Sequence, residues 1–276
     1  MAWDLSVDLI KATVQLEQPQ ADGSRTVGTG FLVQAPTPDG KPRVVLVTAA
    51  HVFERMSGPT ATVGYRVQMK TGEWRFDPKP VTIRIEGAPA WARHPARDVA
   101  AIIVEAPPEF AKAAIPLSWL ASDETFGRYA LGPGDEMMAL GFPRGLSANK
   151  AGFPILRSGR VASYPLIPAS VFPTFLLDFT VFPGNSGGPV FMAQGARRRP
   201  GGSESEEVQF VAGILTQQVE LNDERLNIGI VTHARYVRET IFMLDGVRPL
   251  DLGPVAREPT LTGAEAVSVE AALSEP

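Results

Sequence analysis

A serine inside a glycine-rich turn constrains this chain more than any other feature. It lies in the segment Phe182-Pro-Gly-Asn-Ser-Gly-Gly-Pro-Val190, which apolar residues flank on both sides. Glycines gather around a polar side chain where the backbone turns sharply and approaches another part of the molecule closely. An acyl-transfer nucleophile needs such a turn, with its hydroxyl exposed and backbone N–H groups facing a developing oxyanion. Ser186 supplies the hydroxyl, and Gly184 and Ser186 supply the N–H groups; the plain alternative is a β-turn between two strands.

A serine nucleophile needs a base, and the base needs a group that orients it. The chain has three histidines, of which His51 closes an apolar, β-rich run that begins at Val44. Asp98 opens a second apolar run, residues 98–104, in which it has few polar neighbours. An acid in that position suits a buried imidazole, so the candidates follow the order His51, Asp98, Ser186. The plain alternatives are a core or capping histidine and a turn-capping acid.

Three motifs in this order resemble those of the chymotrypsin-like (trypsin-fold) serine endopeptidases, and within them the bacterial HtrA-like branch. Thr48-Ala-Ala-His51 resembles the general-base motif, Arg97-Asp-Val-Ala100 the Asp-[Leu/Val]-Ala motif, and Gly184-Asn-Ser-Gly-Gly-Pro189 the nucleophile motif. Weaker matches fill the gaps in the right order, at 27–33, 134–143, 158–161 and 229–232. The resemblance covers about residues 8–245.

The resemblance implies an all-β fold of two packed antiparallel β-barrels with a C-terminal helix. Residues 1–115 are expected to form the lobe that carries the histidine and the aspartate. Residues 116–250 are expected to form the lobe that carries the serine and the last helix. Residues 251–276, which are acidic and lose periodicity, are expected to be a flexible tail.

Apolar and alternating segments predict the individual elements. We expect a helical entry within 1–10, a helical turn at 52–55 and a helix at 232–244. A hairpin is expected around Trp74, and prolines are expected to break regular structure in 105–129. The strands are predicted at 11–16, 29–33, 43–48, 60–68, 81–86, 98–104, 136–140, 157–163, 175–181, 189–191, 209–216 and 227–231.

The resemblance also implies a mechanism, in which His51 takes the Ser186 proton as the hydroxyl attacks a peptide carbonyl. Asp98 holds the imidazole, and the N–H groups of Gly184 and Ser186 form the oxyanion hole. The substrate is then a protein or peptide, with no cofactor. No metal-ligand spacing occurs, so we expect no metal. His94 is expected to be a loop histidine, and His233 a cap or packing residue.

The resemblance places the substrate pocket on three segments of the second lobe. Its floor falls at Thr180, which carries no charge, so we expect an uncharged, small or medium apolar residue before the scissile bond (P1). Gln217 and Gln218 lie where substrate backbone pairs as an added strand. The expected substrate-binding residues are Thr180, Val181, Leu215, Thr216, Gln217, Gln218 and Gly229.

Asn185 bears on regulation. In trypsins the matching position is an acid that pairs with a newly cut N-terminus, and a neutral amide holds an ammonium poorly. We therefore expect no activation by amine insertion, and instead a switch through loops, the tail or a protein partner. Too few residues follow the last helix for the PDZ domain of HtrA-like proteins.

Composition limits the compartment and the partners. The net charge is −4, and the tail from residue 251 alone contributes −4 from five acids and one arginine, so nothing favours nucleic acid. The chain has no cysteine, which departs from secreted trypsins and fits a reducing compartment or the HtrA-like branch. Acids in the first ten residues argue against a signal peptide, and no stretch reaches membrane-spanning length, so we expect a cytoplasmic protein with no membrane partner.

Alternative functions remain open at this point. The main alternative is a catalytically silent binding or regulatory subunit of the same fold. An esterase uses the same triad, although a Gly-x-Ser-x-Gly elbow is absent. The loop 194–207, with three arginines beside an acidic run, is either a partner contact, a site of proteolytic nicking or a solvated hairpin loop.

Overall fold

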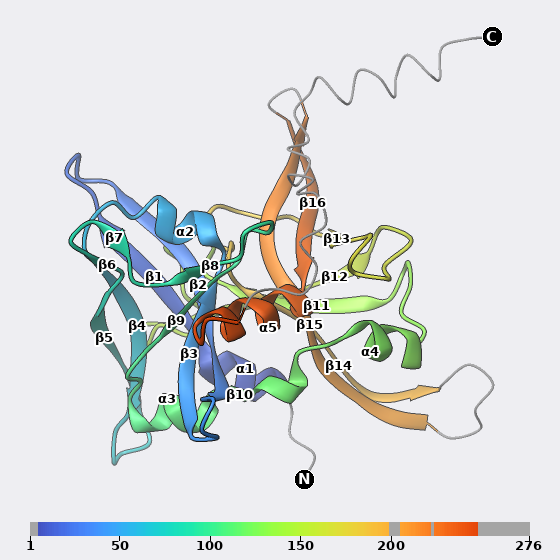
Figure 1. Ribbon diagram of the computed structural model, residues 1–276, viewed down its shortest axis with the longest axis horizontal. Coiled ribbons are helices and arrows are strands. Elements are labelled where there is room, and N and C mark those ends of the chain that lie inside the picture. The colour runs from blue at the N-terminus through green and yellow to red at the C-terminus, as the bar shows by residue number, and fades with distance from the viewer. Residues whose placement is uncertain (1–4, 199–204, 222–223, 248–276) are drawn as a thin grey trace.

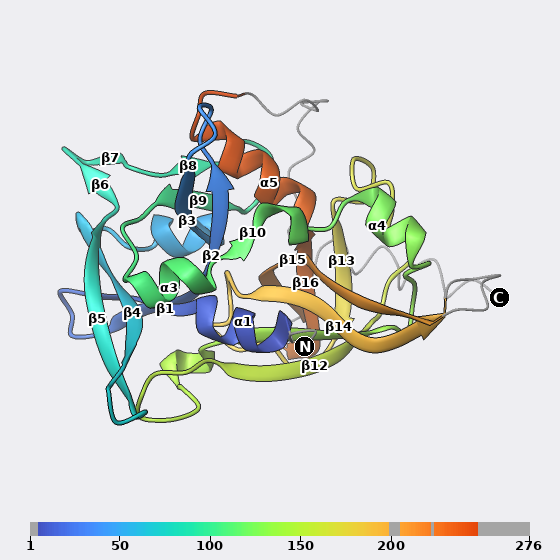
Figure 2. The same ribbon diagram turned by 90° about the horizontal axis from the view of Figure 1, so that it is seen from below.

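An antiparallel sheet occupies the first part of the chain and a closed β-barrel the second. The computed structural model describes residues 5–198, 205–221 and 224–247. The two bodies lie side by side, the sheet on the left and the barrel on the right in both views (Figures 1 and 2).

The first sheet has the strand order β5-β4-β1-β2-β3-β9-β8, and β10 pairs in parallel with β2. The middle of β3, residues 44–47, is an apolar run, and its Val45, Leu46 and Val47 are fully buried because core covers both faces of the strand there. A small separate ladder joins β6 to β7. The bounds are β1 (Thr13–Pro19), β2 (Arg25–Pro36), β3 (Pro42–Thr48), β4 (Thr60–Gln68), β5 (Trp74–Thr82), β6 (Arg84–Ile85), β7 (Ala88–Pro89), β8 (Ala92–Arg93), β9 (Ala100–Ile103) and β10 (Ile115–Pro116).

The second body closes in the order β11-β12-β13-β16-β15-β14. Along β13, Phe175 and Leu177 face the core while their neighbours are less buried, which is the period of two expected of a barrel strand. The β14–β15 and β15–β16 hairpins extend well beyond the barrel (Figure 1). The bounds are β11 (Glu136–Gly141), β12 (Ile155–Val161), β13 (Thr174–Asp178), β14 (Pro189–Arg198), β15 (Ser205–Leu221) and β16 (Glu224–His233).

The helices are short and lie around the two bodies. The last one, α5, contacts β15 of the barrel as well as β8 and β9 of the first sheet. Just after it, Asp245 forms a largely buried ion pair with Arg43 of β3, at 2.5 Å. These contacts join α5 and the turn that follows it to the first sheet. The bounds are α1 (Leu5–Ala12), α2 (Ala50–Glu54), α3 (Pro108–Ala113), α4 (Asp123–Arg128), α5 (Ala234–Met243) and the 3₁₀ turns η1 (Leu117–Trp119) and η2 (Pro143–Gly145).

A buried guanidinium connects α1 to both bodies. Arg66 of β4 is 1% exposed and lies between the rings of Phe110 and Phe153, at 5.0 and 4.8 Å. Burial lowers the pKa of Arg66 to about 9. Its two terminal nitrogens donate to main-chain carbonyls rather than to an acid, while Nε has no partner among the described residues. Three of these carbonyls lie at or just after the negative C-terminal end of α1. The four acceptors are the carbonyl oxygens of Ile10, Lys11, Thr13 and Gly152.

The all-β class with a C-terminal helix is confirmed; of the two expected barrels the second is closed, and the first is an eight-stranded sheet. Two local predictions were wrong. The hairpin expected around Trp74 is formed by β4 and β5, but its second strand begins at Trp74 instead of residue 81 and continues through Pro78 and Pro80. The strand tolerates these prolines because β5 lies at the edge of the sheet, where a residue without an N–H need not remove a hydrogen bond to a neighbouring strand. The segment 105–129 contains α3 and α4 in place of broken structure.

The tail 251–276 and residues 199–204 of the loop 194–207 lie outside the described residues. The expected lobe boundary at residues 115 and 116 coincides with β10, which pairs with β2 of the first sheet. We therefore propose that the boundary between the two lobes follows β10.

Candidate active site

The turn before Ser186 has a shape that depends on glycine. Asn185 N–H donates to the Phe182 carbonyl at 3.0 Å, with a proline and Gly184 at the corner between them. Gly184 has φ = 95°, as the second corner residue of a type II turn requires. A Cβ there would lie 2.3 Å from the Phe142 carbonyl oxygen. No larger residue fits without moving the backbone.

Hydrogen bonds fix the carbonyls of this turn and leave two N–H groups free. The Pro183 carbonyl accepts from Arg144 N–H at 2.6 Å, and the Gly184 carbonyl accepts from the Thr29 hydroxyl at 2.6 Å. In a trans peptide C=O and N–H point in opposite directions, so Gly184 N–H points away from Arg144. Within the described part of the chain, neither Gly184 N–H nor Ser186 N–H has an acceptor. Both are available to an oxygen atom of a ligand.

His51 and Asp98 meet because of strand pairing in the first sheet. β3 pairs Thr48 with Ala100 of β9, so the residues beyond β3 and before β9 lie at the same end of the sheet. His51 lies in the first turn of α2. Asp98 Oδ2 lies 2.6 Å from His51 Nδ1, and Oδ1 accepts the His51 backbone N–H at 2.9 Å. Because a carboxylate only accepts, the proton is on Nδ1 and Nε2 is left as the basic nitrogen.

The Ser186 turn lies against the residues that precede His51. A Cβ on Gly187 would lie 2.3 Å from Thr48 Oγ1 and 3.0 Å from the Ala49 nitrogen. The second body therefore touches the first at the entry to α2. The structure brings the predicted serine turn and the histidine–aspartate pair to one place, at the junction of the two bodies.

The Ser186 hydroxyl itself donates to the Thr216 carbonyl at 3.2 Å. Thr216 is an extra residue in β15, since Leu215 and Gln217 pair with consecutive residues of β16. Such a β-bulge redirects the local backbone. Among the residues that the structure describes, no hydrogen bond joins Ser186 Oγ to His51 Nε2.

Apolar side chains fill the space beside Gly229, where the sequence places the substrate pocket. A Cβ on Gly229 would lie 2.9 Å from Phe179 Cε1, 3.0 Å from Val181 Cγ2 and 3.1 Å from Leu215 Cδ1. Thr180, expected at the pocket floor, lies between two inward-facing residues and is half-buried. Sequence reasoning named Phe179 only as part of a range, although its ring is the largest of the groups around Gly229.

The remaining predicted substrate-binding residues lie on β15. Thr216 is buried and Gln217 is exposed. Gln218 pairs with Gly229 of β16. These residues thus follow one another along the strand next to the serine turn.

Asn185 is nearly buried, at 3% exposed. Its Oδ1 is a buried acceptor, and within the described ranges it has no hydrogen-bond partner. Oδ1 lies 2.9 Å from the position of a Cβ on Gly141, so the side chain is directed toward β11. The side chain carries no charge that could bind an ammonium group.

The other two histidines have structural surroundings. His94 lies in the loop between β8 and β9, as predicted, but it is only 2% exposed, and its Nε2 lies 3.1 Å from the Glu239 carboxylate of α5. His233 packs against the rings of Phe126 and Phe175, at 4.8 and 5.1 Å. Burial lowers the pKa of His233 to about 4, so it is neutral at physiological pH.

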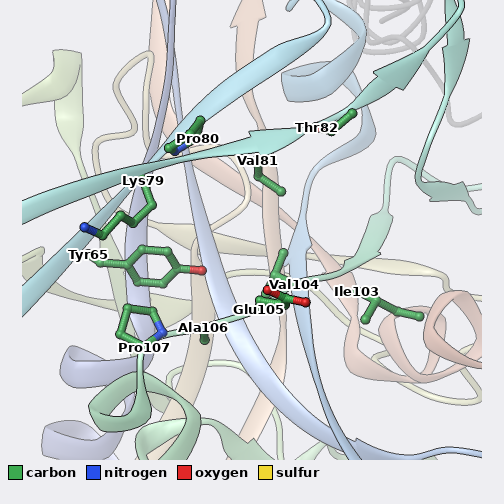
Figure 3. A pocket seen from close by; sticks show the side chains of 10 residues that line it. All are labelled: Tyr65, Lys79, Pro80, Val81, Thr82, Ile103, Val104, Glu105, Ala106 and Pro107. Carbon is green, nitrogen blue, oxygen red and sulfur yellow. The ribbon is translucent and has the colours of Figure 1, made fainter.

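A cavity of about 740 Å³ lies elsewhere, in the first sheet between β5 and the end of β9. Tyr65, Lys79 and Glu105 contribute its polar groups (Figure 3). It contains none of the candidate catalytic residues. The short strand β8 pairs only with Ala100 and Ala101 of β9, so among the described strands Ile102 and Ile103 pair on one side alone, with β3.

Within the described ranges, His, Asp and Glu side chains nowhere gather in a group of three able to bind a metal ion. None of the helices described there has both the length and the apolar character needed to cross a membrane. The cytoplasmic location stays a prediction.

Comparison with known proteins places the chain in a family. The chain resembles the Rv3671c protease from M. tuberculosis in its active form, with a TM-score of 0.50 and 19% identity over 90% of this chain and 87% of that one. A thermostable serine protease, AL20, from an extremophilic microorganism gives a TM-score of 0.49 and 12% identity over 87% of this chain and 100% of that one. No curated protein sequence matches significantly. The family model described as "Trypsin-like peptidase domain" matches residues 28–196, more than half of the chain, and the chain belongs to that family.

Proposed function

We propose that this chain is a serine endopeptidase that hydrolyses peptide bonds through an acyl-enzyme on Ser186. One observation carries the proposal: Asp98 holds both Nδ1 and the backbone N–H of His51 beside a turn with two free N–H groups. A binding module has no use for a basic Nε2 and two free donors near one hydroxyl. Acyl transfer requires all of them.

In the proposed mechanism His51 Nε2 takes the proton from Ser186 as Oγ bonds to the peptide carbonyl carbon. Asp98 stabilises the imidazolium that forms, and the N–H groups of Gly184 and Ser186 donate to the oxyanion. His51 then passes the proton to the leaving amine as the C–N bond breaks. Water attacks the acyl-enzyme with His51 as base, and the proton returns to Ser186 Oγ.

The hydrogen bond from Ser186 to Thr216 is compatible with this mechanism. A hydroxyl side chain moves between staggered rotamers on the picosecond to nanosecond timescale when it is not tightly packed. The free N–H groups indicate better than the Ser186 rotamer whether the site can catalyse the reaction, because their direction depends on backbone conformation. We therefore propose that the oxyanion hole exists at rest and that a rotation of Ser186 directs Oγ to His51.

We propose an uncharged and small P1 residue. The support is the apolar group of Phe179, Val181 and Leu215 around Gly229. A charged P1 side chain finds no opposite charge among these groups and loses its hydration there. A long P1 side chain collides with the Phe179 ring.

The closer assignment to the HtrA-like branch is also a proposal, supported by the motif Gly184-Asn-Ser-Gly-Gly-Pro189 and the cysteine-free sequence. Neutral, buried Asn185 fits a protease that is not activated by an inserted N-terminal amine. We propose that loops or a protein partner adjust its activity instead.

The first experiment is labelling of purified protein with a fluorophosphonate probe, beside Ser186→Ala. We expect the wild type to be labelled by the probe. The variant should have the same melting temperature as the wild type and should not be labelled. A peptide library with varied P1 then separates a peptidase from an esterase. Peptides should be cleaved after small apolar residues.

The rival function predicts different results. A catalytically silent binding subunit folds normally yet fails to label and cleaves no peptide in the library. That result, with and without candidate partner proteins, would contradict the proposed activity. Labelling accompanied by turnover of simple esters alone would favour an esterase.

A further inference from the structure

We propose that Thr29, in the first sheet, is a positioning residue for the oxyanion hole in the second body. Its hydroxyl holds the Gly184 carbonyl, so that the N–H groups of Gly184 and Ser186 stay directed at the reacting carbonyl. The inference rests on the proposed function. It adds a residue to the site that acts through the backbone of the nucleophile turn.

Thr29 is fully buried, and its N–H and hydroxyl form hydrogen bonds across the junction of the two bodies. Thr29 N–H donates to the Ser186 carbonyl at 2.9 Å, and Thr29 Oγ1 donates to the Gly184 carbonyl at 2.6 Å. Oγ1 also accepts the Phe142 N–H at 3.1 Å. The Thr29 carbonyl accepts from the Thr48 hydroxyl at 2.7 Å.

This network allows the Thr29 hydroxyl only one direction. Because Oγ1 accepts from Phe142, its single proton points to the Gly184 oxygen. That bond fixes the peptide between Gly184 and Asn185. The bond from the Thr29 N–H to the Ser186 carbonyl fixes the peptide between Ser186 and Gly187. The backbone on both sides of Asn185 is thereby held by one residue of another strand.

Glycines make room for this approach. A Cβ on Gly187 would lie 2.0 Å from the Thr29 carbonyl oxygen, and one on Gly141 would lie 3.3 Å from Thr29 Oγ1. Within β2, a Cβ on Gly30 would lie 2.9 Å from the Val47 carbonyl oxygen. Close contact of β2 with the nucleophile turn thus depends on residues without side chains.

Thr240 offers a matched control. It is also fully buried, and its hydroxyl donates to a main-chain carbonyl, that of Tyr236, at the same distance of 2.6 Å. That bond stays within α5, four residues along the chain, whereas the bond from Thr29 to Gly184 spans 155 residues. Thr240→Val therefore removes a similar bond without touching the turn.

The test compares Thr29→Val, Thr29→Ser and Thr240→Val for fluorophosphonate labelling and peptide hydrolysis. In Thr29→Val we expect the labelling rate constant and kcat to fall about tenfold or more, with KM within about twofold. Thr29→Ser should retain most of the rate, since it keeps the hydroxyl. Thr240→Val should label like the wild type. Folded Thr29→Val protein that labels at the wild-type rate would overturn the proposal.

Amide hydrogen exchange of the segment 182–188 provides a readout that needs no activity. The N–H groups of Asn185, Gly187 and Gly188 are hydrogen-bonded there and should exchange faster in Thr29→Val than in Thr240→Val. If the wild type proves inactive, the proposed function fails, and equal exchange in the two variants would still refute the role of Thr29. Should Thr29→Val not fold, Thr29→Ala, which is smaller, takes its place in both measurements.

Discussion

Shortening Phe179 should widen the substrate pocket, and the size of the effect follows from the structure. The ring is 7% exposed and its Cε1 lies 2.9 Å from the position of a Cβ on Gly229. A P1 side chain that reaches Gly229 therefore meets the ring. Phe179→Ala removes this obstacle and leaves apolar walls formed by Val181 and Leu215.

The expected gain is the burial of a larger P1 side chain. Burying a leucine side chain stabilises a complex by about 1.5–3 kcal/mol. If the transition state gains that energy, kcat/KM for a P1 leucine peptide rises by about 10- to 100-fold relative to a P1 alanine peptide. The wild type should prefer alanine, and Phe179→Ala should reverse the order.

The assay measures kcat/KM for peptides that differ only at P1: alanine, valine, leucine and phenylalanine. Phe175→Ala is the control, because Phe175 is another buried ring beside β16 that packs on His233. Both variants lose stability, so each is measured below its melting temperature. An unchanged order of substrates in folded Phe179→Ala protein, or an equal change in both variants, would refute the assignment of the pocket.

Three further predictions test other parts of the structure. Asp98→Asn should lower kcat about 10⁴-fold with little change in melting temperature, because the His51 tautomer is no longer fixed; a loss below tenfold in peptide hydrolysis would contradict the triad. Arg66→Met should lower the free energy of unfolding by about 2–4 kcal/mol, since four carbonyl acceptors lose their donor; urea denaturation showing a loss under about 1 kcal/mol would contradict this account. His233 has a pKa lowered from 6.5 to about 4, so below pH 6.5 the unfolded chain binds a proton that the folded chain refuses. Stability is therefore lost as pH falls from 6.5 to 4, by about 3 kcal/mol in total. His233→Leu should remove that loss, and an unchanged dependence of the unfolding free energy on pH would count against it.

The predicted pair of His51 and Asp98 meets because its geometry depends on local sequence. Each lies beside an apolar run, and apolar runs of this kind become neighbouring strands of a buried sheet. Once β3 and β9 pair, the residues just outside them lie at the same edge. The apolar runs beside His51 and Asp98 therefore indicated where in the sheet the two residues would lie.

The helices α3 and α4, in the segment that connects the two bodies, were harder to predict. Proline and short polar residues can either interrupt a helix or begin one. Pro108 was taken as a breaker, but it stands at the first position of α3, where the missing N–H costs nothing. Ser122 begins α4 with a reciprocal cap to Thr125. A capping box usually shows Glu or Gln at that third position, and threonine hid the signal.

The contacts that complete the site were out of reach of sequence reasoning for a physical reason. A glycine in a sequence can indicate that a side chain is excluded at that position, but it does not indicate which atoms exclude it. Gly187 has φ = 91°, as a turn residue can, but it also has to be glycine because the Thr29 carbonyl oxygen lies 2.0 Å from where its Cβ would be. Thr29 in turn looks like an ordinary strand threonine, and its hydroxyl has a role only because Gly184 lies across the junction. The segment 182–190 supplies the chemical groups of the serine turn, whereas Thr29, more than 150 residues away in the chain, helps to hold the conformation of that turn.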